Sequence, residues 1–174
     1  GAISRVFFDY TYGSIGPVAT GTFSWTPPAG LSSTTSNPVA ASPMATTTYT
    51  VNVDNGAGCI RQANITITVN DRPVVTTQPT SVSSCNGSAA TFTVAGTGTG
   101  LSYQWQVSTT GPGGPWTNLA NAAPYSGVTT ATLTINPVSL ALSGNNYRAV
   151  LSGSCAPVGT TNISNAVVLT VNAL

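Results

Sequence analysis

The strongest constraint on the fold is an alternation of apolar and polar residues with a period of two. Gly, Pro, Ser and Asn separate these stretches, and β-branched residues are frequent in them, which is typical of short strands joined by turns. Only "VSLALSGNN" (138–146) suggests a helix, and it is too short and broken for more than one turn. The sequence therefore predicts an all-β fold. The alternating stretches are "TYTVNV" (48–53), "ANITITV" (63–69), "AATFTVA" (89–95), "YQWQV" (103–107), "ATLTIN" (131–136) and "AVVLTV" (166–171).

The same order of signals occurs twice along the chain. The first series is "TFSW", "TYTVNVDNGAGC" and "NITITVN", and the second is "SYQW", "NYRAVLSGSC" and "AVVLTVN". Each series has an aromatic strand, a Tyr-led strand, a cysteine and a closing strand, as expected of an internal repeat. Between them lies "NDRPVV" (70–75), with a proline directly after a strand, as in a linker. We predict two domains, residues 1–70 and 71–174.

The second unit can be matched to an immunoglobulin-like sandwich. The stretch "GSAATFTVAG" (87–96) has the spacing of strand B, Trp105 takes the place of the buried tryptophan of strand C, and Tyr147 takes the tyrosine-corner position. Val94 and Ala149 stand where antibody domains place their two bridged cysteines, so packing alone must join the sheets there. We expect two tandem immunoglobulin-like β-sandwich domains, the first shorter and lacking its first strand.

Both units also resemble known bacterial repeats. "YQWQVSTTGPGGPWTNLANAAPYSGVTTATLTI" is similar to the Ig-like repeats of very long secreted surface proteins of Bacteroidota. "TFSWTPPAGLSSTTSNPVAASPMATTTYTVNVDNGAGC" resembles the companion PKD-like repeat of the same proteins, which include gliding adhesins and type IX secretion cargo. The resemblance covers roughly residues 20 to 174. It implies a stalk, adhesive array or spacer on a bacterial cell surface and specifies no single activity.

Ionisable side chains are scarce in this chain. Charged residues make up 4% of it, against about 25% in an average soluble protein. General acid–base chemistry usually needs a His or a tuned carboxylate, and a zinc site needs four closely placed ligands. The composition therefore predicts a non-enzymatic protein with no cofactor and no metal site. Apart from Cys and Tyr, the ionisable side chains are Asp9, Asp54, Asp71, Arg5, Arg61, Arg72 and Arg148.

Charge and hydropathy also restrict the partners. A net charge of +1 gives almost no counterion release, which argues against nucleic-acid binding. No apolar run reaches the roughly 18 residues of a membrane span, so we expect no membrane insertion. No signal peptide opens the chain, which suggests a mature or excised segment. Low charge, abundant Thr and widely spaced cysteines favour an extracellular location.

The chain has three cysteines, so one bridge at most can form within it. Cys85 precedes strand B and Cys155 follows strand F, and we expect these strand ends to approach the roughly 5.5 Å Cα separation of a disulfide. Cys59 holds in the first unit the place of Cys155 in the second. Its partner would fall at Arg5, so we expect Cys59 to be free or linked to a neighbouring chain.

The N-terminal segment is too short for a complete first domain. "SRVFFDYTYG" (4–13) can serve as strand B or as a substitute for strand A, and the remaining gap would leave a sheet edge open. A preceding domain or a strand donated by another copy could fill it, and repetition of such a contact gives a filament. The candidate inter-subunit strand comprises Val6, Phe7, Phe8, Tyr10 and Tyr12.

The aromatic residues divide into core and candidate contact positions. We assign Trp25 and Trp105 to the cores and regard Trp116 and Tyr125, in the 108–127 hairpin, as candidate ligand contacts. "VDNGAG" (53–58) has one Asp and fits a turn better than a calcium loop. The predicted function is a structural or adhesive module of an extracellular fibre, whose partners are other copies or adjacent repeats. The alternative is a glycan- or protein-binding accessory module.

Overall fold

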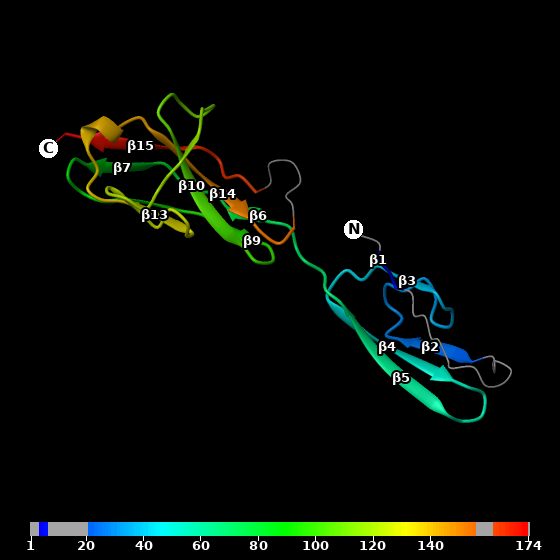
Figure 1. Cartoon of the computed structure of the whole chain (residues 1–174). Helices are drawn as coiled ribbons and strands as arrows, with labels where there is room; N and C mark the ends of the chain where they lie inside the picture. Colours follow the sequence, from blue (N-terminus) through cyan, green and yellow to red (C-terminus); the bar gives the residue numbers. More distant parts are fainter. Residues whose placement is uncertain (1–3, 7–20, 156–161, 174) are drawn as a thin grey trace. The chain divides into compact units, whose positions relative to one another are not determined.

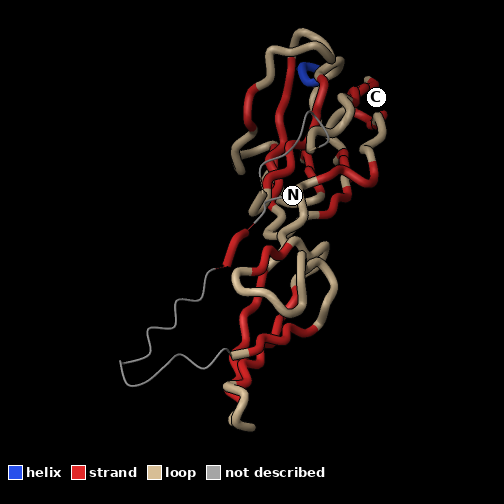
Figure 2. The backbone as a smooth tube through the Cα atoms, turned by 90° about the vertical axis from the view of Figure 1, so that its right-hand side faces the viewer, coloured by secondary structure: helices blue, strands red, loops and turns tan. Residues whose placement is uncertain are grey.

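The computed structural model describes the chain at residues 4–6, 21–155 and 162–173. The chain divides into two compact units, Gly1–Val69 and Asn70–Leu174, one residue from the predicted boundary. The described residues of both units form strands, loops and turns, apart from the single 3₁₀ turn η1 (Leu140–Leu142) (Figure 2). That turn lies in the stretch for which the sequence predicts no more than one helical turn. The fold is all-β.

The first unit contains five described strands in two sheets. The larger sheet has the order β2 (Thr22–Thr26), β4 (Thr47–Asp54) and β5 (Ile60–Ile67), with antiparallel neighbours. The smaller sheet pairs β1 (Ser4–Val6) with β3 (Val39–Ala41), also antiparallel. Figure 1 shows β4 and β5 as a long hairpin, and β2 lies beside β4 on the side away from β5.

The core of the first unit is small and centred on two aromatic residues. Trp25 is buried, and its indole Nε1–H donates a hydrogen bond of 3.1 Å to the carbonyl oxygen of Ser36. Tyr49 is also buried, and its hydroxyl donates to the carbonyl oxygen of Ala29 at 2.7 Å. Each aromatic ring thus lies in apolar surroundings while its polar group is satisfied. The other buried apolar residues are Val39, Ala41 and Val51.

The second unit is a larger sandwich. Its long sheet is antiparallel except where β7 runs parallel to β15, and a shorter sheet lies opposite it, as Figure 1 shows. The long sheet has the order β11 (Thr117–Asn118), β10 (Ser102–Ser108), β14 (Asn146–Ser152), β15 (Val167–Asn172) and β7 (Val82–Cys85). The shorter sheet has the order β12 (Tyr125–Ser126), β13 (Thr132–Ile135) and β8 (Ala90–Thr93). A separate pair joins β6 (Val74–Thr77) and β9 (Ala95–Thr97).

Aromatic packing joins the two sheets of this sandwich. Trp105 is fully buried, and its Nε1–H donates to the carbonyl oxygen of Thr130 at 3.0 Å. Phe92 from the opposite sheet lies 6.3 Å from the Trp105 ring and 5.1 Å from the Tyr147 ring, measured between centroids. Val94 and Ala149, at the positions of the antibody cysteines, are buried as well. The chain is therefore built from immunoglobulin-like sandwiches whose sheets pack without a central disulfide.

The strand registers show that the two units repeat the same framework. Trp25 of β2 pairs with Val51 of β4, and Trp105 of β10 pairs with Ala149 of β14. In each unit a buried tyrosine precedes the partner of the tryptophan by two residues. The strands β2, β4 and β5 of the first unit therefore correspond to β10, β14 and β15 of the second.

The predicted disulfide between Cys85 and Cys155 is wrong, because the two residues lie at opposite ends of the second sandwich. Cys85 ends β7 opposite Asn172 of β15, whereas Cys155 follows the far end of β14, which runs antiparallel to β15 (Figure 1). They are separated by roughly ten residues along the sheet, or about 33 Å. All three cysteines are free thiols, and the Sγ of Cys155 donates to the carbonyl oxygen of Asn70 at 3.3 Å.

We expect all three cysteines of the folded monomer to react with an alkylating reagent when no reductant is present. Cys59 and Cys85 are exposed and should be modified first, whereas Cys155 is half-buried and should react more slowly. Mass spectrometry of the alkylated protein with and without prior reduction would measure this. A mass corresponding to one modified cysteine, rising to three only after reduction, would contradict the arrangement described above.

Candidate interaction surfaces

The outer edge of β5 pairs with no other strand among the described residues of the first unit. β5 is eight residues long, stands at the end of the sheet order and has an uninterrupted register with β4. The backbone N–H of Asn55 donates to the carbonyl oxygen of Cys59 at 3.3 Å, and hydrogen-bonded pairs recur every second residue in an antiparallel ladder. The backbone N–H groups of Gln62, Asn64 and Thr66 therefore face away from β4. We call this row the open edge of β5.

The equivalent edge in the second unit is covered. There the parallel strand β7 pairs with β15 from Leu169 to Asn172. Before β7 begins, two side chains bond to backbone N–H groups at and ahead of β15. Ser81 Oγ accepts from the N–H of Val168 at 3.1 Å, and Gln78 Oε1 accepts from the N–H of Asn165 at 2.7 Å. Val168 corresponds to Thr66, because each pairs with the residue before the core tyrosine. The described residues of the first unit contain no counterpart of β7.

The apolar face beside the open edge is also less covered than its counterpart. In β15 the inward residues Val167, Leu169 and Val171 are 6%, 0% and 6% exposed. In β5 the corresponding Ile65 and Ile67 are only half-buried. Ile60, at the start of the strand and on its other face, is 63% exposed. A long edge with one charged residue, no proline and no bulge is a template for pairing with another strand.

The N-terminal segment pairs within its own unit where it is described. Val6 lies opposite Val39, so β1 runs antiparallel to β3 just as β8 runs antiparallel to β13 in the second unit. β1 thereby takes the place of strand B, one of the two alternatives that the sequence left open. The other candidate inter-subunit residues, Phe7, Phe8, Tyr10 and Tyr12, lie outside the described residues.

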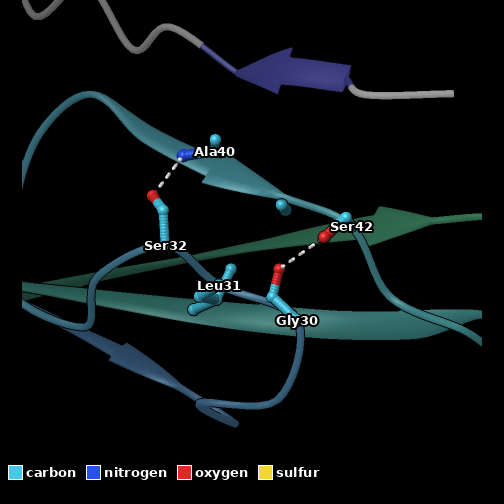
Figure 3. A pocket seen from close by; sticks show the side chains of 6 residues that line it. Gly30, Leu31, Ser32, Ala40 and Ser42 are labelled. Carbon is cyan, nitrogen blue, oxygen red and sulfur yellow. Dashed lines mark hydrogen bonds between the residues drawn. The ribbon is translucent and has the colours of Figure 1, made fainter. Parts of the chain in front are cut away.

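A shallow hollow of about 300 Å³ lies beside β3 in the first unit. Two antiparallel segments form it: Ser32 Oγ accepts from the N–H of Ala40 at 3.0 Å, and Ser42 Oγ contacts the carbonyl oxygen of Gly30 at 3.5 Å (Figure 3). Gly30 has a φ of +78°, and a side chain there would meet Pro43. The lining residues are small and uncharged, so the hollow offers no group for acid–base chemistry. They are Gly30, Leu31, Ser32, Ala40, Ala41 and Ser42.

A polar row with one tryptophan lies on the outer face of the long sheet of the second unit. Arg148 follows buried Tyr147 and precedes buried Ala149, so its side chain points away from the core. Its Nε donates to Gln106 Oε1 at 2.8 Å, and Gln106 Nε2 donates to Asn118 Oδ1 at 2.8 Å. The guanidinium carbon lies 4.2 Å from the centroid of the Trp116 ring. We call these residues, Trp116, Asn118, Gln106 and Arg148, the Arg148 cluster.

The two candidate ligand contacts of the hairpin do not share one surface. Trp116 is half-exposed beside β11 of the long sheet, whereas Tyr125 is in β12 of the shorter sheet and packs against the core. The hydroxyls of Tyr125 and Tyr147 are 3.5 Å apart. Burial, reinforced by this hydrogen bond, raises the pKa of Tyr147 above its ordinary value, so this hydroxyl stays protonated. Tyr125 is thus a packing residue.

The described residues bring no catalytic or metal-binding constellation together. No three potential metal ligands of the His, Cys, Asp or Glu type lie close to one another in the described part of the chain. Nor does any helix there have the length and apolar character needed to cross a lipid bilayer. In the described part of the chain, the open edge of β5 and the Arg148 cluster are the two surfaces considered as candidate interaction sites.

The chain is similar in fold to tandem immunoglobulin domains of known structure. The N-terminal eight Ig domains of Down Syndrome Cell Adhesion Molecule match 91% of this chain with a TM-score of 0.65 and 15% identity. DIP-gamma IG1+IG2 matches 89% with a TM-score of 0.58 and 15% identity, and the complex of Dpr2 Ig1-Ig2 with DIP-Theta Ig1-Ig3 matches 88% with a TM-score of 0.53 and 16% identity. The chain spans 22%, 84% and 57% of these three structures, respectively.

No protein-family model and no curated protein sequence matches the chain. At identities of 15–16%, the structural likeness establishes the tandem immunoglobulin fold.

Proposed function

We propose that the chain is a non-catalytic extracellular module, a subunit or segment of a bacterial cell-surface fibre or stalk that is assembled by β-strand complementation. The observation that carries this proposal is the open edge of β5. The same edge is covered by β7 in the second unit of the same chain, whereas no strand pairs with it among the described residues of the first unit. A strand supplied from outside the first unit would satisfy the backbone groups of Gln62, Asn64 and Thr66.

The first unit acts as the receiver of the strand in this proposal. Ser4–Val6 is already paired with β3, so donation of a strand that includes Val6 would require that sheet to open. The incoming strand would run parallel to β5, as β7 runs parallel to β15. The donor is a neighbouring copy or an adjacent repeat. Repetition of such a head-to-tail contact produces an open filament.

The similarity to adhesion proteins supports an extracellular role. One structural neighbour is by name a cell adhesion molecule, and another is a complex between immunoglobulin domains of two proteins. The scarcity of ionisable side chains supports a role without catalysis. The resemblance to Bacteroidota surface repeats supports the bacterial cell surface as the location.

A glycan- or protein-binding accessory module is the second candidate. It is favoured by the half-exposed ring of Trp116, whose neighbour Arg148 carries one of the four positive side chains of the chain. In this candidate the immunoglobulin-like units hold the Arg148 cluster in place for a ligand. The two candidates use different units and can both apply.

We expect the purified chain to form non-covalent oligomers at high concentration. The chain contains no Lys, so isopeptide cross-links between subunits cannot form, and boiling in detergent with reductant should release monomers only. Sedimentation velocity and negative-stain microscopy would measure the assembly, and gel electrophoresis its release. A strictly monomeric chain would exclude the homopolymer, so that only an adjacent repeat could supply the incoming strand. A ladder that survives boiling would contradict the non-covalent mechanism.

A further inference from the structure

The Arg148 cluster holds an arginine in a fixed orientation on the outer face of a sheet. Gln106 of β10 lies directly across from Arg148 of β14 and from Asn118 of β11, so the three side chains form one row across three strands. The hydrogen bond from Arg148 Nε to Gln106 and the contact of the guanidinium carbon with the face of the Trp116 ring restrain the orientation of the guanidinium. Such restraint lowers the entropy that the side chain would lose on binding a ligand.

Most of the hydrogen-bonding capacity of Arg148 remains unused. A guanidinium carries five N–H donors, and only Nε–H has a partner among the described residues. The terminal amino groups of Arg148 have no hydrogen-bond or ion-pair partner in the described part of the chain. They form a planar fork whose spacing matches the two oxygens of a carboxylate.

No ion pair joins Arg148 to an acidic side chain among the residues that the structure describes. Of the three acidic side chains of the chain, Asp54 and Asp71 form no ion pair with Arg148, and Asp9 lies outside the described residues. Partial burial lowers the pKa of Arg148 below its ordinary value, because desolvation disfavours the cation. A bound anion would balance the charge of this cation.

The surroundings of the cluster favour a sugar over a protein surface. The large apolar side chains that are exposed among the described residues, Met44, Ile60, Val74 and Leu140, are not part of the long sheet that carries the cluster. The apolar side chains on this outer face include the half-exposed Trp116 and the half-buried Val150 and Val168, which offer little apolar area for the centre of a protein interface. Around Arg148 lie amide side chains, which suit a ligand rich in hydroxyl groups. A single cation also matches the single charge of a carboxylate better than the double charge of a phosphate.

We propose that the Arg148 cluster binds a carboxylate-bearing sugar, with the carboxylate on the terminal amino groups of Arg148 and the sugar beside Trp116 and Asn118. This inference concerns the second unit and does not depend on strand complementation by the first. It extends the binding-module candidate by naming the ligand chemistry and by adding three residues to Trp116. Sialic and uronic acids both have this chemistry, and the experiment distinguishes them.

The test is a titration of the ¹⁵N-labelled chain with glucuronic acid and with N-acetylneuraminic acid, followed by NMR at the Arg148 Nε–H and Trp116 Nε1–H signals. We expect saturable shifts with a Kd on the order of 1 mM for one of the two acids. Glucuronic acid methyl ester and glucose, which lack the charge, should bind at least about tenfold more weakly. Glucose 6-phosphate should bind no better than the preferred acid.

Matched variants separate the site from general charge effects. Arg148→Gln should weaken binding by about tenfold or more, and Arg148→Lys should also weaken it because an ammonium cannot form the bidentate contact. Arg61→Gln removes the same charge from the first unit and should leave binding unchanged. Trp116→Ala should weaken binding through loss of the stacked arrangement, and each variant is checked for an unchanged melting temperature.

Several results would overturn the proposal. The absence of shifts at these two signals with both acids up to tens of millimolar would do so, as would equal binding of the methyl ester. Binding that survives Arg148→Gln would place the ligand elsewhere. If acetate or an Asp-containing peptide binds as tightly as either sugar acid, the cluster recognises the carboxylate alone and the sugar adds nothing to binding. The saccharide assignment would then fail.

Discussion

Replacement of Trp105 by alanine is expected to lower the free energy of unfolding of the second unit by about 3–5 kcal/mol. Trp105 is 0% exposed and contacts Phe92 of the opposite sheet, so its removal leaves a cavity where the two sheets meet. The variant also loses the 3.0 Å bond from Nε1 to Thr130 and leaves that carbonyl oxygen with one partner fewer. Because domains are stable by roughly 5–15 kcal/mol, a loss of this size brings the second unit close to unfolding.

Urea denaturation monitored by tryptophan fluorescence would measure this effect. Trp116 still reports on the second unit in Trp105→Ala, and Trp25 reports on the first, so the two transitions can be followed in one protein. Trp105→Phe keeps most of the apolar volume and should cost much less. Trp25→Ala is the matched variant in the first unit and should leave the second transition unchanged. If Trp105→Ala were as stable as the parent protein, the assignment of this residue to the core would be refuted.

Local sequence pattern was sufficient to predict the strands and the core positions. Alternation with a period of two identifies strands because it reflects which face of a sheet is buried, and this is decided within a few residues. The Trp and Tyr positions could be recognised because large aromatic residues at the centre of a sandwich have few substitutes. The same pair of aromatic residues occurs twice, as Trp25 with Tyr49 and as Trp105 with Tyr147. This recurrence predicted the two-unit organisation.

The absence of the disulfide could not be predicted, because the distance between Cys85 and Cys155 depends on the direction of a strand relative to its neighbours. Cys85 was placed before strand B and Cys155 after strand F, which is correct along the chain. The strand β7, which ends at Cys85, runs parallel to β15, whereas β14 runs antiparallel to β15. Cys85 and Cys155 therefore lie at opposite ends of the long sheet. Spacing along the sequence contains no information about this direction.

The Arg148 cluster was missed for a related reason. Trp116 was singled out in the sequence, but its neighbour Arg148 is 32 positions further along, and Gln106 bonds to Arg148 across 42 positions. Cross-strand pairs of this kind depend on the register of the sheet. The one available signal was the charged residue between two apolar positions in "NYRAV", which places Arg148 on the outer face of its strand.

Replacement of Thr66 by proline is expected to abolish assembly while the first unit stays folded. The N–H of Thr66 faces away from β4, so a proline there removes no bond of the existing sheet. It does remove a donor from the open edge of β5 at the position where Val168, its counterpart, is bonded to Ser81. The proline ring would also obstruct an incoming strand, and interruption of one ladder position should block complementation along the edge.

Thr66→Ala is the matched control, because both variants lose the 2.7 Å contact between the Thr66 and Thr48 hydroxyls and only the proline loses the backbone donor. Sedimentation velocity should show oligomers for the parent chain and for Thr66→Ala, and monomers for Thr66→Pro. Circular dichroism and the urea transition reported by Trp25 should be nearly the same for the two variants. Equal loss of assembly in both would assign the effect to the side chain, and unimpaired assembly of Thr66→Pro would show that another surface joins the subunits. The backbone of β5 explains assembly only if the two variants differ.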